Sequence, residues 1–213
     1  MMELLQATYE TIKMSVLALF FSYLFGFPLG ILTNETDKYG LFKNKVIHSV
    51  CEVIIGFGRA VPFTILMVLT LPLTRFIVGT GIGSTACVIP LTIAAVPFVG
   101  RQVSQSLDQV DFWVVKAAKI DNASKLKIIL KIKVGSRLFD IVSTIGNTSI
   151  AIISYTAICG MLGGGGLGNY AIVKGYYQYD WASVAIATVI IVAIVCVFQW
   201  LFKLISRLID WRK

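Results

Sequence analysis

The residues most suggestive of chemistry form a glycine motif, Gly163-x-Gly165-x-x-Gly168. Such spacing cradles the phosphates of a dinucleotide where it follows a β-strand and opens a helix. Here it follows an apolar stretch long enough for a membrane helix, and Asn169 stands where a phosphate-binding loop would need lysine. We therefore expect no nucleotide binding by this chain, and we interpret the glycines as positions of close packing between helices or loops.

The thiols and the single histidine predict no catalytic or metal site. The four cysteines share no CxxC spacing, and each stands alone in an apolar stretch, as inert buried thiols do. His48 lies near the end of an apolar stretch, and a proton relay would need more acidic residues within such stretches. We therefore expect no catalytic residue, no metal and no cofactor.

Polar residues inside apolar stretches predict a route for a small solute, because charged residues within a membrane face the bundle interior or an aqueous cavity. Two alternatives stay open. Arg59 could instead be a structural anchor near a kink at Pro62, and the later polar side chains could join helices by hydrogen bonds. Glu52 lies about 10 Å from Arg59 along a helix, too far for an ion pair. The predicted route residues are Arg59, Pro62, Asn147, Tyr155 and Met161.

A basic segment, residues 101–137, predicts a compact helix–turn–helix. It holds eight of the 19 lysines and arginines. Asp111 can cap a first helix, Asn122 can adopt the left-handed conformation that ends it, and residues 124–134 can form a second helix. The pattern fits two roles equally well, docking to a soluble partner or lying on anionic lipid. In an α-helix, one face of the second helix would carry Leu126, Ile129, Leu130 and Lys133.

The composition indicates a membrane protein. Of the 213 residues, 57% are hydrophobic and 14% are charged, whereas soluble domains are about one quarter charged. No linker composition divides the chain, so we predict a single transmembrane domain over residues 1–213. Its fold class is all-α and polytopic, with five transmembrane helices. The predicted helices cover about residues 12–32, 46–71, 85–100, 138–162 and 181–202.

The distribution of positive charge predicts the orientation. Five spans place the loop 34–45, the segment 101–137 and the tail after residue 202 on one side, and these hold 3, 8 and 4 cations, 15 of the 19. Lysine and arginine stay on the cytoplasmic side. We therefore expect the N-terminus outside and the C-terminus in the cytoplasm. The net charge of +8 then reflects orientation in a cell membrane, with lipid and not nucleic acid as the contact.

The basic segment resembles the EAA loop of binding-protein-dependent ABC importer permeases, the loop that couples them to their ATPase. That pattern reads Glu-Ala-Ala, three residues, Gly-Ala, eight residues, Ile-x-Leu-Pro. This chain keeps the spacing in Lys116-Ala117-Ala118, Asn122-Ala123 and Ile132-Lys133-Val134-Gly135, but lacks the Glu, the Gly and the final Leu-Pro. Lys116 reverses the family's charge, which implies a compensating change in the ATPase or weaker coupling. The resemblance implies coupling contacts at Lys116, Ala117, Ala118, Asn122, Ala123 and Ile132.

Other stretches resemble the permeases of methionine importers, and together they cover nearly the whole chain. They include Arg59-Ala60-Val61-Pro62-Phe63 and Gly164-Gly165-Gly166-Leu167-Gly168. The resemblance implies a homodimeric permease, two cytoplasmic ATP-binding subunits and an external substrate-binding protein, often lipid-anchored. Such a permease performs no covalent chemistry and is not an enzyme. Its implied substrate is a small amino acid, methionine or a related compound.

Two other functional classes remain as alternatives. A secondary transporter driven by an ion gradient would predict inverted repeats and paired intramembrane acids, and the single Glu52 argues against it. A membrane anchor for a soluble enzyme would explain the basic segment, but not the polar residues within apolar stretches.

Overall fold

The computed structural model describes residues 1–209, and over that range the chain is all-α, without strands. Arg212 and Lys213, two of the cations counted in the tail, lie outside the described residues. The α-helices are α1 (Met2–Thr36), α2 (Lys45–Ala60), α3 (Phe63–Leu69), α4 (Leu71–Val78), α5 (Ser84–Asp108), α6 (Phe112–Ile120), α7 (Lys125–Lys127), α8 (Leu138–Cys159), α9 (Gly166–Tyr170) and α10 (Trp181–Ile209). The described fold also contains the π-helical segments η1 (Ile128–Val134) and η3 (Ala171–Tyr176), and a kinked segment η2 (Gly160–Gly164), in which Leu162 and Gly163 leave the helical conformation.

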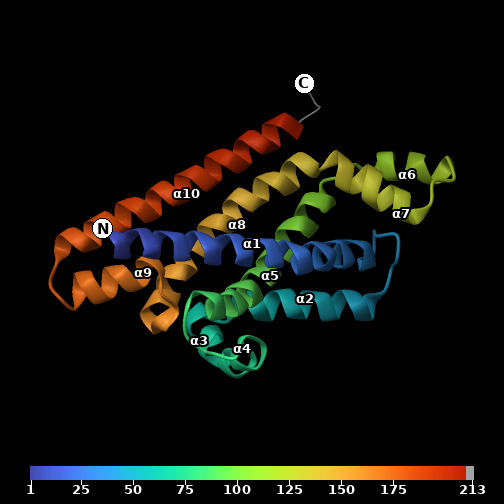
Figure 1. The fold of residues 1–213 in the computed structure, drawn as a ribbon. Coiled ribbons are helices and arrows are strands. Elements are labelled where there is room, and N and C mark those ends of the chain that lie inside the picture. Colours follow the sequence, from blue (N-terminus) through green and yellow to red (C-terminus); the bar gives the residue numbers. More distant parts are fainter. Residues whose placement is uncertain (210–213) are drawn as a thin grey trace.

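Four helical segments are long and apolar enough to cross a membrane: α1, α5, α8 together with η2, and α10. The pair α2 and α3 would be a fifth span, bent in its middle. Figure 1 shows α6 and α7 at one end of the molecule, and the N-terminus with α9 at the other. The predicted fold class, an all-α polytopic membrane protein with five transmembrane helices and a helix–turn–helix, is therefore confirmed, with α2 and α3 counted as one bent span.

The helix predicted over 46–71, with a kink at Pro62, is divided into α2 and α3, because the chain breaks at Val61 and Pro62. There α2 and α3 meet at 107°. Proline lacks a backbone N–H and forces the preceding residue out of the helical region. Val61 accordingly has φ −74° and ψ 124°, and Pro62 has φ −57° and ψ 134°. Beyond α3, the short helix α4 returns the chain towards α5 and ends at Gly79, which adopts φ 81°.

Two helices extend beyond the ranges that hydropathy predicted. Helix α1 begins at Met2, ten residues before the predicted start, and α5 continues to Asp108, eight residues past Gly100. The added turns of α5 belong to the segment 101–137 that we expected to form the loop. They remain helical because Val103 and Leu107 are buried against α1 and α8, and packing stabilises a helix more than its local propensity does.

The centre of the fold is the close contact between α1 and α5. A Cβ added to Gly26 would lie 2.7 Å from the Cβ of Val99, and one added to Gly30 would lie 2.6 Å from the Cβ of Val103. Two small residues four apart let helix backbones approach closely within a membrane. Gly26 and Gly30 therefore fix where α1 crosses α5.

The glycine motif forms a tight corner against the first turns of α1. Gly165 and Gly166 have φ of 73° and 75°, the region that favours glycine. The N–H of Gly166 donates to Glu10 Oε2 at 2.8 Å, and the N–H of Leu167 donates to Thr11 Oγ1 at 2.8 Å. The motif thus packs α9 onto α1, which is the close packing expected from the sequence.

An ion pair holds the same end of the molecule together. Lys174 Nζ lies 2.9 Å from Glu3 Oε2. The hydrogen bond to Glu3, and then its negative charge, raise the pKa of Lys174 above the usual value. Both side chains are exposed, so the pair contributes little to stability.

We predict that Gly30→Ala destabilises the protein by about 1–3 kcal/mol, because the added methyl group forces α1 and α5 apart. The matched control is Gly146→Ala in α8, where a Cβ would meet Phe202 Cβ at an ordinary 3.7 Å. Both substitutions gain the same helix propensity, roughly 1 kcal/mol. The difference between their free energies of unfolding therefore measures the cost of the packing clash alone. Thermal unfolding in detergent measures both. Equal stability of the two variants would contradict the close contact.

Candidate functional site

The helix–turn–helix, residues 111–134, is hereafter the coupling hairpin. Asp111 caps α6 by accepting a hydrogen bond from the N–H of Trp113 at 2.8 Å. Asn122 turns the chain with φ 55°, and the N–H of Ala123 donates to the carbonyl oxygen of Ala118 at 3.0 Å. Ser124 then caps the second helix by accepting from the N–H of Lys127. The predicted cap and the predicted left-handed turn are both present.

The second helix of the hairpin winds differently from the prediction. After one short α-helical turn it becomes the π-helix η1, in which backbone hydrogen bonds join residues five apart. Ile128, Ile129 and Lys133 are buried there. Leu126 and Leu130, which an α-helix would place on the same face as Lys133, are exposed instead.

The predicted coupling residues separate into an exposed and a covered group. Lys116, Ala117 and Asn122 are exposed. Ala118 is buried in an apolar cluster that joins the two helices of the hairpin to the loop between α1 and α2. Ala123 and Ile132 are half-buried against the same cluster. The cluster is Leu41, Ala118, Ile128 and Ile129.

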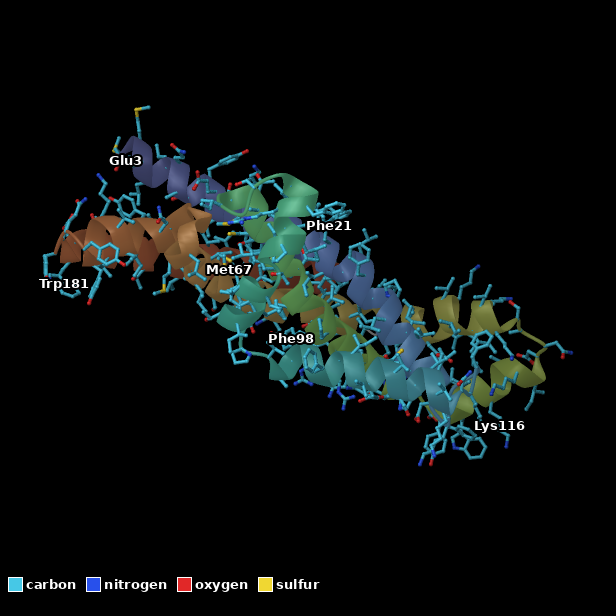
Figure 2. The ribbon with its side chains drawn as sticks, turned by 90° about the horizontal axis from the view of Figure 1, so that it is seen from below. Glu3, Phe21, Met67, Phe98, Lys116 and Trp181 are labelled. Atoms are coloured by element: carbon cyan, nitrogen blue, oxygen red, sulfur yellow. The ribbon has the colours of Figure 1, made fainter. Side chains whose placement is uncertain are left out.

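The exposed face of the hairpin is both apolar and basic. Trp113 is 67% exposed and Ile120 is 73% exposed, and Lys116 Nζ lies 4.9 Å from the centre of the Trp113 ring. Figure 2 places Lys116 at the end of the molecule opposite to Glu3 and Trp181. Large exposed apolar side chains beside cations indicate a surface for a partner or a membrane.

The hairpin joins the membrane helices through a buried polar cluster that the sequence did not predict. Lys133 Nζ lies 2.5 Å from both Glu35 Oε1 and Asn34 Oδ1, at the end of α1. Asn34 in turn donates to Asp108, the last residue of α5, and Glu35 also accepts from the N–H of Leu41. One signal was available: Lys133 fell on a predicted apolar face, where a cation requires a buried acidic partner.

A second group of predicted residues surrounds the bend between α2 and α3. Phe63, directly after Pro62, stacks on Tyr155 of α8, with ring centres 4.5 Å apart and planes within 9°. The stack lies in the apolar core, with Met67 of α3 and Leu91 of α5. Two of the predicted route residues, Pro62 and Tyr155, are thereby brought to one place.

The other route residues are exposed. Arg59 lies in the last turn of α2, Asn147 lies on α8 two turns before Tyr155, and Met161 lies in η2 with 62% exposure. A polar side chain on a membrane helix faces a partner helix or an aqueous cavity, not lipid. These side chains therefore point to a face of the chain that another protein or an aqueous route covers.

Glu52 finds a partner on another helix. Arg101 of α5 donates to both its carboxylate oxygens, at 2.9 and 3.3 Å. The sequence excluded a pair between Glu52 and Arg59, but offered no way to choose Arg101, 49 residues away. The ion pair between Glu52 and Arg101 joins α2 to α5.

Comparison with known proteins gives consistent results. The chain is 37% identical over 209 residues to a probable D-methionine transport system permease protein MetI of Vibrio cholerae, covering 98% of this chain and 93% of that one. It is 40% identical over 210 residues to the methionine import system permease protein MetP of Bacillus subtilis, with 99% and 95% covered.

Solved structures agree in fold. A chain of the MetNI methionine ABC transporter, in inward-facing conformations, superposes with a TM-score of 0.96 at 30% identity, covering 99% of this chain and 97% of that one. A chain of an amino acid ABC transporter shares the fold at a TM-score of 0.78 and 20% identity.

The family model described as "binding-protein-dependent transport system inner membrane component" matches residues 26–211. That range holds the bend at Pro62, the Phe63–Tyr155 stack and the whole coupling hairpin. This protein belongs to that family of membrane permeases.

Proposed function

We propose that the chain imports methionine or a close relative as the permease of an ATP-driven transporter. One observation carries the proposal: over nearly its whole length the chain is similar both to methionine permeases and to the MetNI structure, at a TM-score of 0.96. The sequence left two alternatives open, an ion-gradient transporter and a membrane anchor for an enzyme. The similarities reported above support neither of them.

The chain works as a subunit and is not itself an enzyme. We infer that ATP is hydrolysed by a separate cytoplasmic subunit, present in two copies, and that the permease pairs with a second copy of itself; the likeness to the MetNI methionine ABC transporter supports this. An external binding protein would deliver the substrate, which agrees with the family description as a binding-protein-dependent transport system. The exposed Arg59 and Asn147 suit a face covered by the second copy or open to the route between the copies.

The coupling hairpin is the docking site for the ATPase. Its exposed residues, Lys116, Ala117 and Asn122, make the contact together with Trp113 and Ile120. Ala118, Ala123 and Ile132 instead hold the shape of the hairpin from within. When the ATP subunits close and open, they displace the hairpins, and the two copies alternate access to the route.

The route passes the bend between α2 and α3. Arg59, Pro62, Asn147, Tyr155 and Met161 line it. With one cation, an amide, a phenol and a thioether, this lining suits a small zwitterion with an apolar side chain better than a polyanion or a metal ion. In such a system the binding protein sets much of the specificity, so the route itself can be weakly selective.

The hairpin end of the molecule faces the cytoplasm. The support is the concentration of lysine and arginine in residues 34–45 and 101–137. Glu35 at the end of α1 contacts the hairpin, whereas Glu3 at its start contacts Lys174. The N-terminus therefore lies outside and the C-terminus in the cytoplasm.

We predict that a strain without its own methionine importers regains uptake of labelled methionine, at least about tenfold above background, when it expresses this chain with its neighbouring ATPase and binding protein. The matched control expresses the same partners without this chain. Robust uptake of an unrelated solute, with none of methionine or its peptides, would reject the substrate.

Orientation is tested with single cysteines at Ser124 and Asn169, in a chain whose native cysteines are replaced. An impermeant thiol reagent applied to whole cells should label position 169 and leave position 124 unlabelled until the cells are opened. Equal labelling of both positions from outside would refute the orientation.

Ala117→Asp should weaken docking of the ATPase about tenfold, ~1.4 kcal/mol, because it places a carboxylate on the contact face while leaving the buried cluster intact. The matched control is Ala182→Asp, an exposed alanine at the start of α10, where an acidic residue suits the helix N-terminus. Co-purification of the ATPase measures docking. Undiminished association of the Ala117 variant would favour a hairpin that lies on lipid.

A further inference from the structure

Among the described residues, Lys133 is a buried cation that joins the coupling hairpin to a membrane helix. Its side chain is 10% exposed, and that of Glu35 is 3% exposed. The ammonium group contacts Glu35 and Asn34, and Asn34 contacts Asp108. A single side chain of the hairpin is thus linked to the ends of both α1 and α5, the two helices that meet at Gly26 and Gly30.

Stability alone does not account for this arrangement. Removing two charges from water costs several kcal/mol each, and a buried ion pair often contributes nothing net compared with apolar residues of the same size. What such a pair provides is a defined geometry, because hydrogen bonds to charged groups are short and directional. The apolar cluster around Ala118 and Ile128 also touches α1 through Ile31, but apolar contacts are non-directional.

The surroundings of both partners direct the two charged groups at each other. Lys133 lies on the buried side of η1 together with Ile128 and Ile129. Lys131, two residues earlier on the same segment, is exposed. The carboxylate of Glu35 is held from its other oxygen by the N–H of Leu41, which leaves Oε1 directed at Lys133.

We propose that Lys133 is a positioning residue that links the coupling hairpin rigidly to α1 and α5. Through it, a displacement of the hairpin by the ATPase moves both helices as one unit. The proposal rests on the proposed function, because it requires an ATPase that acts on the hairpin. In this proposal the exposed face of the hairpin contacts the ATPase, and Lys133 passes the resulting movement to the membrane helices.

The test uses the complete transporter, with ATPase and binding protein, in proteoliposomes. ATP hydrolysis and methionine uptake are measured together for Lys133→Met, Lys133→Arg and the matched control Lys131→Met. For Lys133→Met we expect hydrolysis within about threefold of wild type but uptake per ATP lowered at least tenfold. Lys133→Arg should recover most of the ratio, and Lys131→Met should not change it. An unchanged ratio for Lys133→Met would overturn the proposal.

A double variant separates positioning from stability. Glu35→Gln with Lys133→Met leaves no unpaired buried charge, so assembly should recover even where the single variant folds poorly. We expect its uptake per ATP to stay at least tenfold low. Return of the ratio to the wild-type value would mean that the pair only stabilises the fold, and would overturn the proposal.

Hydrogen–deuterium exchange provides a readout that does not depend on the substrate. Peptides covering 112–134 in the complete complex should exchange faster in the double variant than in Lys131→Met, and equal rates would overturn the link. If wild-type transporter hydrolyses ATP but carries no methionine, the proposed substrate fails, while the exchange measurement still decides the role of Lys133.

Discussion

Gly26 and Gly30 allow the backbone of α1 to lie directly on α5, and the positions of the other described elements follow from that contact. A membrane interior offers little hydrophobic force between helices, so close van der Waals approach has to hold them together. One end of the α1–α5 pair receives the glycine corner of α9, and the other receives the coupling hairpin. The pair therefore connects the two ends of the molecule.

Two acidic side chains on the candidate membrane helices have a cationic partner on another element. Glu52 has Arg101, and Glu35 has Lys133. Arg59 and Asn147 are exposed on membrane helices, a position that a single copy in lipid would not tolerate. The second copy of the chain proposed above would cover that face or form a route with it.

Much of the fold could be predicted from the sequence, since long apolar runs have few alternatives in a membrane. The cap at Asp111 and the turn at Asn122 were also predictable, because each depends on neighbours within a few residues. The 107° bend was not: a proline indicates a break, but tertiary packing sets its angle. The α-helical pattern placed Lys133 correctly on the buried side with Ile129, but it also placed Leu126 and Leu130 there, and these two are exposed.

Within the candidate site, residue types were more predictable than partners. The loop spacing identified the hairpin, and polarity identified Arg59 and Tyr155. The stack of Tyr155 on Phe63 and the pair of Glu52 with Arg101 join residues far apart in sequence, and no local pattern encodes which distant segments meet. Ala118 shows the same limit, because its small size fits a surface contact and a buried position equally well.

The corner at Gly166 also constrains the order of assembly during synthesis. Glu10 and Thr11 emerge early, but their partners at Gly166 and Leu167 lie 156 residues later. At about 5–20 residues per second, a ribosome needs roughly 8–30 s to make that interval. Throughout that time Glu10 and Thr11 lack these partners. The end of the protein that holds the glycine corner is therefore completed late, after the coupling hairpin has already been synthesised.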